Sequence, residues 1–451
     1  MSLILLATLG SLGDLNPYIA VGRALVARGQ SVRLATSIDY RARVEAAGLE
    51  FAPLAPSIAE LGEPEQIARR FFDPWRGPQR LFDAMVTGPL RRAYADVRAA
   101  VEGVTLAVSH PLTPALPLVA ESCGLPWLSS VLAPYSLFST TDPSVIPNFE
   151  WLHPLRRLGS WPHDMLLNVA RASVRRWERP VHTLRAELGL PPYAGALLID
   201  GQFSPRGTLG LFDPSLATPQ PDWPAGTIVC GAALHDTGDP QDASAAADDM
   251  LERFLAAGPP PVVFALGSSA VWLARDYWSH AIDACRTLGV RGLLLTGMPL
   301  QQRLPATVAA FDYLPYSRVF SRAAAIVHQA GIGTLSFALR AGRPQLLTPA
   351  GFDQSDNAAR AARLGIGRVL PFRRAHNPVR LARELRTLLE GPTYARAAVE
   401  WAEQSRGVDG AVAAAQCIIG CISLPHSAGT TPGHDDQKNC TALQPNDSEP
   451  H

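Results

Sequence analysis

Residues 326–358 read IVHQAGIGTLSFALRAGRPQLLTPAGFDQSDNA and contain the most informative pattern in the chain. An apolar run enters this stretch and ends at His328, a glycine-rich turn follows, and a helix is expected up to Gly342. A second apolar strand is expected over residues 345–348, with Asp353 and Gln354 shortly after it. This order is half of a doubly wound parallel sheet, in which ligands bind beyond the carboxyl ends of the strands.

The residue types around the turn predict what such a site binds. Backbone N–H groups at the start of the helix point outward, and the helix dipole favours negative charge there, so a phosphate group fits. His328 beside the turn can donate a hydrogen bond to a phosphate oxygen. Asp353 and Gln354 suit the hydroxyl groups of a sugar. The stretch therefore predicts a binding site for a nucleotide-diphosphate sugar.

The same stretch resembles the nucleotide-sugar signature of GT-B family 1 glycosyltransferases, often written HHGGxGT…GxP…P…DQ..NA in its bacterial form. The resemblance implies contacts to the diphosphate from one set of residues: His328, Gly331, Gly333 and Thr334. It implies contacts to the sugar hydroxyls from Asp353 and Gln354. An ordinary turn with a chance Asp-Gln pair is the alternative, and the number of matching positions at fixed spacing disfavours it.

The chain departs from that signature at two positions. Ala330 stands where many relatives have glycine, and we expect the extra methyl group to be tolerated. Ser336 stands where plant-type relatives carry a glutamate that binds the ribose hydroxyls. The absence of this glutamate favours a deoxyribose donor.

Length and composition restrict the class of protein. A chain of 451 residues should form two domains, because single cores stop growing near about 250–300 residues. Forty basic residues balance forty acidic ones, which argues against nucleic acid as a partner. The six cysteines form no CxxC or other metal-ligand pattern, and no signal peptide or long apolar span is present, so we expect a cytoplasmic protein.

The chain also opens with a strand, a glycine turn and a helix, expected over residues 3–8, 10–17 and from Tyr18 to about Arg28. The turn, GSLGDLNP, is similar to the GSxGDxxP opening of the same family, whose aspartate is the catalytic base. The resemblance assigns that role to Asp14 and places Gly13 beside the acceptor. A carboxylate there can accept a proton from an acceptor hydroxyl. The alternative is that Asp14 only caps the helix.

Other candidates follow later strands. The tip Ser268-Ser269, after a strand expected over residues 262–266, lines the diphosphate in the family, although a plain turn explains it equally well. Backbone groups around Leu314 and Pro315 correspond to the loop that binds the base. His110 ends a strand expected over residues 106–109 and could line the acceptor site, although a lone histidine is more often structural.

Residues 151–190 alternate an apolar face with arginines at helical spacing. Such a helix either packs on the core with its basic face in solvent, which we favour, or contacts a membrane surface. Residues 43–101 look helical but broken, as expected of a segment that borders an acceptor pocket.

Together these patterns predict an α/β protein of GT-B architecture, with two Rossmann-like doubly wound parallel-sheet domains facing a central cleft. The expected parts are an acceptor domain (1–224), a linker (225–249), a nucleotide-sugar domain (250–395), a helix crossing back to the first domain (396–424) and a disordered tail (425–451).

The predicted function is inverting transfer of a hexose, such as rhamnose or glucose, from a dTDP- or UDP-sugar to a hydroxyl of a hydrophobic acceptor. The overall resemblance points to bacterial sterol-glucosyltransferase-like and rhamnolipid-type rhamnosyltransferases, and hence to a lipid, sterol-like or natural-product acceptor with peripheral membrane association. No cofactor is expected, and no two aspartates stand at D-x-D spacing, so we expect no metal. The alternatives are a non-catalytic relative that activates another transferase, and a nucleotide-sugar 2-epimerase. The oligomeric state stays open.

Overall fold

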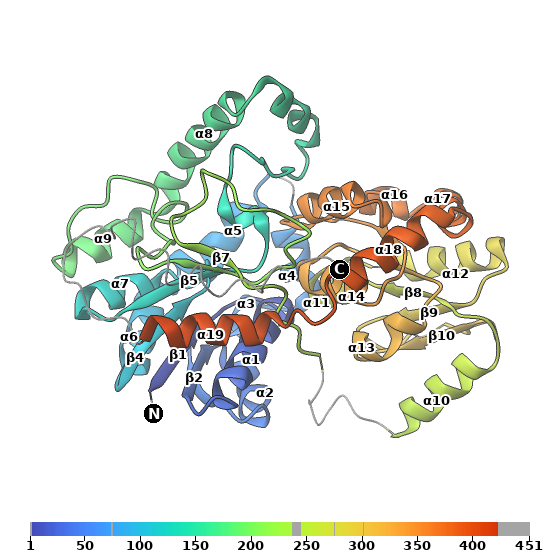
Figure 1. The fold of residues 1–451 in the computed structure, drawn as a ribbon, viewed down its shortest axis with the longest axis horizontal. Helices are drawn as coiled ribbons and strands as arrows, with labels where there is room; N and C mark the ends of the chain where they lie inside the picture. Colours follow the sequence, from blue (N-terminus) through green and yellow to red (C-terminus); the bar gives the residue numbers. More distant parts are fainter. Residues whose placement is uncertain (1, 74, 237–244, 275, 301, 423–451) are drawn as a thin grey trace, which may run out of the picture.

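A computed structural model describes residues 2–73, 75–236, 245–274, 276–300 and 302–422, and it shows two α/β domains (Figure 1). The first contains a seven-stranded sheet of order β3-β2-β1-β4-β5-β6-β7, and the second a six-stranded sheet of order β10-β9-β8-β11-β12-β13. Every strand pair is parallel. The predicted fold of two doubly wound sheets is confirmed.

Helices cover both faces of the first sheet. Its strands are β1 (Leu3–Ala7), β2 (Ser31–Thr36), β3 (Glu50–Pro53), β4 (Val104–Ser109), β5 (Trp127–Val131), β6 (Thr208–Gly210) and β7 (Thr227–Val229). Alternate side chains of a strand point to opposite faces. Accordingly, Ile4 and Leu6 pack with α1 (Leu12–Val26), whereas Leu5 and Ala7 pack with α6 (Leu90–Ala100) and α7 (Ala115–Cys123).

The second sheet is built in the same way. Its strands are β8 (Val262–Ala265), β9 (Gly292–Leu295), β10 (Val308–Phe311), β11 (Ala325–His328), β12 (Gln345–Leu347) and β13 (Gly367–Val369). Phe264 and Val327 pack against α12 (Tyr277–Leu288) and α17 (Pro378–Glu390), and Ile326 packs on the other face against α14 (Ile332–Arg340). Burial on both faces explains why these strands read as short apolar runs.

Further helices complete the two domains. In the first domain they are α2 (Arg41–Ala46), α3 (Ile58–Leu61), α4 (Pro64–Phe71), α5 (Gly77–Phe82), α8 (Trp161–Trp177) and α9 (Arg179–Glu187). In the second they are α10 (Ala245–Ala256), α11 (Gly267–Ala270), α13 (Tyr316–Val319), α15 (Gln354–Arg363) and α16 (Phe372–Ala375). Single-turn or irregular helices are η1 (Ile38–Tyr40), η2 (Asp83–Thr87), η3 (Pro134–Leu137), η4 (Glu150–Leu158), η5 (Val271–Leu273) and η6 (Phe320–Arg322).

The structure corrects the predicted division of the chain at three places. Strand β7 lies in the predicted linker but pairs with β6, so the first sheet continues beyond residue 224. Helix α10 also begins inside that linker. The predicted C-terminal helix is two helices, α18 (Pro392–Gln404) and α19 (Gly410–Ile422), because the chain turns at Gly407, whose φ is 88°. The predicted tail, 425–451, lies outside the described residues.

The last two helices belong to different domains. Helix α18 packs against α14 in the second domain. Helix α19 runs along the first domain (Figure 1), where Ala411, Ala414 and Ile418 join the core cluster formed by β1 and α1. The chain therefore crosses back between these two helices.

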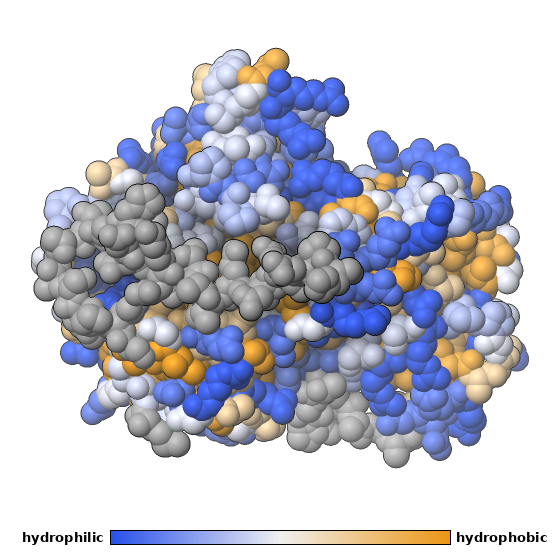
Figure 2. Space-filling model, viewed as in Figure 1, coloured by the Kyte–Doolittle hydropathy of each residue, from blue (hydrophilic) through white to orange (hydrophobic). Residues whose placement is uncertain are grey.

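Helix α8 is not core-packed, contrary to the favoured prediction. Only Pro162 and His163 of this helix are buried, because it projects away from the sheet layers (Figure 1). Trp161, Met165 and Val169 are 58%, 61% and 64% exposed, and apolar residues are visible at the tip of this projection (Figure 2). Among the described residues no helix is long and apolar enough to cross a membrane. Contact of α8 with a membrane surface stays a prediction.

Candidate active site

The turn after β1 holds the carboxylate of Asp14 in a fixed orientation. Ser11 is the N-cap of α1, and Asp14 Oδ2 accepts hydrogen bonds from the Ser11 N–H at 2.7 Å and from its hydroxyl at 3.0 Å. This reciprocal capping box starts the helix at Leu12, earlier than the predicted Tyr18. Gly10 has a φ of 131°, and a Cβ there would lie 2.3 Å from Asp14 Oδ2, so the turn has no room for a side chain.

The two carboxylate oxygens of Asp14 have different surroundings. The predicted roles of this residue, catalytic base and helix cap, are therefore compatible. Oδ2 caps the helix, whereas Oδ1 lies 3.7 Å from Nε2 of His110 and is not used by the cap. The Asp14 side chain is 31% exposed, so it is accessible to a ligand. Gly13 beside it is also exposed, and its N–H donates to the Ser11 hydroxyl.

His110 is held at the carboxyl end of β4 with a defined tautomer. Its Nδ1 accepts the N–H of Leu112 at 3.3 Å, which leaves the proton of the neutral ring on Nε2, facing Asp14. Burial lowers the pKa of His110, and Asp14 partly opposes that shift. The 3.7 Å gap is too long for a direct hydrogen bond, but an oxygen atom about 2.8 Å from both groups fits it. The structure therefore places His110, which the sequence shows without a partner, next to Asp14.

The structure places His328 differently from the prediction. The residue is fully buried, its Nε2 lies 2.9 Å from Gln345 Oε1, and its Nδ1 accepts the N–H of Ala330 at 3.2 Å. Burial lowers the pKa of His328 to about 4, so the ring is neutral. Both ring nitrogens are engaged inside the domain, so His328 fixes the turn and cannot donate to a diphosphate outside it.

Gln329, to which the sequence motif gives no role, lies at the glycine turns instead. Its amide nitrogen lies close to two glycines. A Cβ on Gly267 would lie 2.2 Å from this nitrogen, and a Cβ on Gly331 would lie 2.8 Å from it. Its Oε1 is buried and has no partner among the described atoms. The amide of Gln329 therefore lies between the loops that follow β8 and β11, where the diphosphate is predicted.

Helix α14 begins directly after this turn. Gly331 is its N-cap and provides no side-chain cap, so the first N–H groups of the helix, including those of Gly333 and Thr334, are available to an anion. The Thr334 side chain lies 3.4 Å from the Gln329 amide nitrogen. Ala330 has a left-handed φ of 65°, a backbone conformation that glycine adopts more readily than alanine. Of the predicted serines, Ser268 is exposed and Ser269 is partly exposed.

The predicted sugar-binding residues surround the start of α15. Asp353 Oδ2 accepts from Asn357 Nδ2 at 2.6 Å, and Asn357 also donates to the Ala330 carbonyl at 3.0 Å. Gln354 Oε1 accepts the backbone N–H of Ala350 at 2.9 Å, so it braces its own loop. Asn357, which received no role from the sequence, thus ties the sugar loop to the glycine turn.

The charge of Asp14, in the first domain, acts on the carboxyl of Asp353 in the second. Burial raises the pKa of Asp353 to about 7, Asn357 lowers it, and the negative charge of Asp14 raises it further. Ile332, at the start of α14, packs against first-domain clusters that contain Leu15 and Phe212. The glycine turn, the sugar loop and Asp14 therefore surround one site.

The predicted base-binding loop lies between β10 and α13. Leu314 is 2% exposed and packs in the domain core, and Pro315 is also buried, so mainly backbone groups are left to contact a base. The Ser336 hydroxyl donates to the Ile332 carbonyl at 2.8 Å within α14, so this side chain is a neutral group with its own partner. No group of three or more acidic, histidine or cysteine side chains that could hold a metal ion occurs in the described parts of the chain.

Comparisons with known proteins show the family to which the chain belongs. Residues 4–112 match the glycosyltransferase family 28 N-terminal domain, and residues 295–414 match the erythromycin biosynthesis protein CIII-like C-terminal domain. The chain is 33% identical to the O-mycaminosyltylonolide 6-deoxyallosyltransferase of Streptomyces fradiae, over 90% of this chain and 95% of the relative. It is 29% identical to the vancomycin aglycone glucosyltransferase of Amycolatopsis orientalis, over 93% and 98%.

A solved structure supports the fold. The spinosyn rhamnosyltransferase SpnG complexed with thymidine diphosphate superposes with a TM-score of 0.63 at 18% identity, over 93% of this chain and 100% of that one. The narrower resemblance to sterol and rhamnolipid enzymes stays a prediction. The fold, the two family matches and the full-length relatives show that this chain belongs to the GT-B family 1 glycosyltransferases.

Proposed function

We propose that this protein transfers a hexose, with inversion, from a thymidine-diphosphate sugar to a hydroxyl group of a neutral, hydrophobic natural product. The observation that carries the proposal is the Asp14 oxygen that the cap leaves free, 3.7 Å from His110 Nε2. The charge of Asp14 raises the pKa of Asp353 in the other domain, and Ile332 at the start of α14 packs against the first domain beside Leu15. A base for the acceptor and a binding site for the donor are thereby adjacent.

The geometry supports a direct displacement. The acceptor hydroxyl occupies the gap between Asp14 Oδ1 and His110 Nε2, donating its proton to Asp14 and accepting the hydrogen bond of His110. Its oxygen attacks the anomeric carbon while the bond from that carbon to the diphosphate oxygen breaks, and the proton passes to Asp14. The opposite directions of attack and departure invert the anomeric centre.

Neutral donors stabilise the leaving diphosphate in this proposal. The N–H groups of Gly333 and Thr334 lie at the uncapped start of α14, where the helix dipole favours an anion, and the Gln329 amide nitrogen lies 3.4 Å from the Thr334 hydroxyl. Such preorganised donors are commonly the largest catalytic contribution. Asp353, Gln354 and Asn357 hold the sugar loop. The D-x-D pattern of metal-dependent donor sites is absent from the sequence, and this supports turnover without a divalent cation.

The nucleotide part of the proposal rests on Ser336. A hydroxyl already bonded to Ile332 provides no bidentate acceptor for ribose hydroxyls, and this favours deoxyribose. The thymidine-diphosphate complex of SpnG supports the same nucleotide. Two relatives support a natural-product acceptor, because one is an O-mycaminosyltylonolide 6-deoxyallosyltransferase and the other a vancomycin aglycone glucosyltransferase.

The proposal is tested by incubating the protein with dTDP-glucose, dTDP-rhamnose or UDP-glucose and with hydroxylated macrolactones, aromatic polyketides and sterols. We expect glycosylated product from a dTDP-sugar and a macrolactone or polyketide, in the presence of EDTA, with inverted configuration by NMR. Product only with a divalent cation would contradict metal independence. Binding of donors without any transfer across the panel would favour a non-catalytic relative.

A further inference from the structure

The end of helix α4 brings an aromatic side chain of the first domain onto the second domain. Phe72 is the C-cap of α4, and its side chain is half-buried. It packs against the core cluster of the second domain, as do Trp272, Leu273 and Ala350. Helix α4 lies beside η5 of the second domain, where the two domains meet (Figure 1). Phe72 therefore reaches across the domain boundary.

There Phe72 contacts the sugar loop, residues 348–353 between β12 and α15. Its ring centroid lies 4.8 Å from that of Phe352, and the two ring planes meet at 74°. This edge-to-face arrangement is favourable between aromatic rings. A Cβ on Gly351 would lie only 3.0 Å from Cδ1 of Phe72, so the ring also lies directly against the backbone of the loop. Both contacts immediately precede Asp353.

The backbone of Phe352 needs such support. Its φ is 55°, in the left-handed region that costs free energy for any residue with a Cβ. A residue keeps this conformation where its surroundings hold it in place. The ring of Phe72 packs on the Phe352 side chain and supplies a holding contact from the other domain. The conformation of Phe352 in turn sets the direction of the next residue, Asp353, whose carboxylate accepts from Asn357.

The first domain fixes the position of Phe72 itself. In the turn that follows it, Asp73 Oδ1 accepts the backbone N–H groups of Trp75 at 3.0 Å and Arg76 at 2.7 Å. The Asp73 carbonyl accepts the N–H of Gly77 at 2.9 Å. These bonds tie the end of α4 to the start of α5. Phe72 is therefore presented to the sugar loop from a well-held turn.

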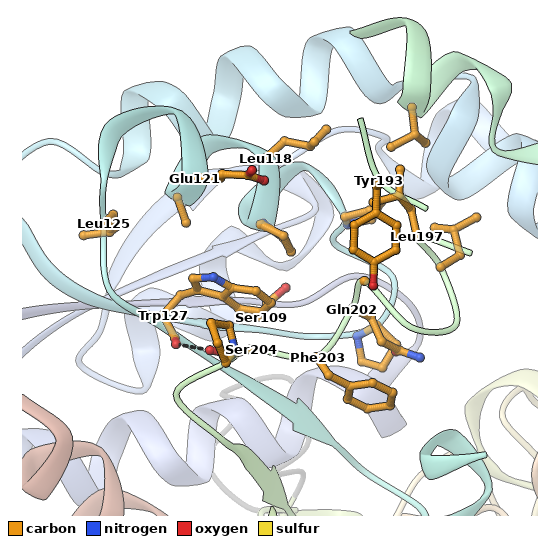
Figure 3. Close-up of a pocket in the computed structure, with 18 of the residues that line it drawn as sticks. Ser109, Leu118, Glu121, Leu125, Trp127, Tyr193, Leu197, Gln202, Phe203 and Ser204 are labelled. Atoms are coloured by element: carbon orange, nitrogen blue, oxygen red, sulfur yellow. Dashed lines mark hydrogen bonds between the residues drawn. The ribbon is translucent and has the colours of Figure 1, made fainter. Parts of the chain in front are cut away.

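The pocket of the first domain is separate from this contact. It has a volume of about 390 Å³ and lies between α7, which contributes Leu118, and the segment with Tyr193 and Leu197 (Figure 3). Among the described residues, none of α4 or of the sugar loop lines it. A change at Phe72 therefore acts on the sugar loop and not through this pocket.

We infer that Phe72 is a positioning residue for the donor sugar, which holds Phe352 and thereby Asp353 in the arrangement that binds the sugar. This inference rests on the proposed function and deepens it. Recognition of the sugar then needs a contact from the acceptor domain, whereas recognition of the nucleotide diphosphate does not. The sugar part of the donor site is complete only when the two domains are in contact at Phe72.

The test is calorimetric titration of the full-length protein with dTDP, dTDP-glucose and dTDP-rhamnose. We expect Phe72→Ala to bind the dTDP-sugars about tenfold more weakly than the wild type and dTDP within about twofold of it. Trp75→Ala is the matched control, because Trp75 makes the same kind of edge contact, 5.6 Å at 89°, with Phe149 inside the first domain. This control should bind all three ligands as the wild type does.

Two further variants test the route through Phe352. Phe72→Leu fills the space without a ring and should weaken dTDP-sugar binding about threefold, even where Phe72→Ala fails to fold. The double variant Phe72→Ala/Phe352→Ala should bind the dTDP-sugars no more weakly than Phe352→Ala alone, because the two rings act as one unit. Thermal unfolding confirms that each variant is folded.

Three results would overturn the role of Phe72 alone. They are an unchanged dTDP-sugar affinity in the folded Phe72 variants, an equal loss of dTDP and dTDP-sugar affinity, and additive losses in the double variant. Absence of binding of dTDP and of both dTDP-sugars by the wild type would instead overturn the proposed function, and with it the role of Phe72 at the sugar.

Discussion

At the scale of single residues, Asp14 has both a structural and a proposed chemical role. One of its oxygens caps α1, and the other faces His110. We expect Asp14→Asn to lower kcat by about a hundredfold to ten-thousandfold, since the amide accepts no proton at pH 7. The amide oxygen can still accept from Ser11, so stability should change little. Asp14→Ala should lose the same activity and also about 1 kcal/mol of unfolding free energy. Chemical denaturation and product assays together distinguish the two variants. An Asp14→Asn enzyme with wild-type activity would contradict the assignment of Asp14 as the base.

The carboxyl of Asp353 makes the stability of the protein depend on pH. Its pKa is raised to about 7, so between pH 4 and 7 the folded state binds more protons than the unfolded state, and this group contributes less stability as pH rises. The full shift corresponds to at most about 4 kcal/mol, which partial exposure of the side chain reduces. Asp353→Asn should therefore stabilise the protein more at pH 8 than at pH 5. A difference in denaturation midpoint that is independent of pH would contradict this assignment.

The sequence does not show in which direction a side chain points, and this limited the prediction of individual site residues. His328 and Gln329 are neighbours at the end of a strand, and successive side chains there point to opposite sides. The sequence pattern identifies the turn but does not show that His328 faces Gln345 in the core while Gln329 lies at the glycine loops. His110 was ambiguous for a different reason, because its partner Asp14 is distant in the chain and adjacent only in the folded sheet.

At the scale of elements, the two glycine turns of the second domain confine the Gln329 amide. A Cβ on Gly267 would lie 2.2 Å from that amide nitrogen, and the φ of Gly267 is 67°. Gly289 is a matched control, because its φ is 66° and a Cβ there would meet no atom within 4 Å. Replacement of either glycine by alanine should cost about 1 kcal/mol from backbone strain.

Only the Gly267→Ala variant should also lose donor affinity, because it displaces the Gln329 amide. We expect dTDP to bind it at least tenfold more weakly than the wild type and to bind Gly289→Ala normally, as measured by calorimetric titration. Equal dTDP affinity in the two variants would show that the position of the Gln329 amide does not matter for binding.

Most elements were predictable because glycine and proline mark their ends. The strand β2 and the turn before α14 follow such signals directly. The start of α1 and the strand β3 differ from the prediction for physical reasons. Pro17 suggests the start of a helix, but the Ser11–Asp14 capping box starts α1 earlier and leaves Pro17 inside it. Strand β3 has mixed exposure and ends at Pro53, so it lacks the apolar run of a central strand.

At the scale of the whole molecule, a buried ion pair connects the two domains beside the sugar loop. Arg360 on α15 is 2% exposed and bonds to Asp356 on the same helix and to Asp142 of the first domain. Asp356 also accepts the N–H of Val145 at 2.9 Å. This contact sets how α15 meets the first domain, and hence the distance between Asp353 and Asp14.

Removal of this arginine should therefore affect both stability and catalysis. Arg360→Met removes the charged partner of the buried Asp356 and leaves Asp142 only its 3.6 Å pair with Arg363, and we expect a loss of about 3–5 kcal/mol of unfolding free energy. Arg363→Met is the control, because its 3.6 Å pair with Asp142 is 37% exposed on the arginine side and should contribute at most about 1 kcal/mol. Small-angle scattering should show a larger radius of gyration for folded Arg360→Met only. Identical scattering and stability in the two variants would contradict the role of Arg360 as an interdomain contact.

The two-domain plan was predictable from repeated strand–turn–helix patterns, whereas the domain contacts were not. Asp142 and Arg360 carry no motif, and their pairing depends on how two separately folded domains meet. The same reason applies to α8, whose amphipathic pattern predicts a packed face although the structure leaves it exposed.

The proposed donor site is tested most directly by calorimetric titration of the purified protein with dTDP-glucose, dTDP-rhamnose and UDP-glucose in the presence of EDTA. The titration is repeated on Gln329→Leu and on a control, Gln220→Leu, at a half-buried position in the first domain. We predict that a dTDP-sugar binds the wild type and the control alike, without metal, and binds Gln329→Leu at least tenfold more weakly. Absence of binding by every nucleotide sugar, or binding that Gln329→Leu leaves unchanged, would contradict the assignment of the donor site.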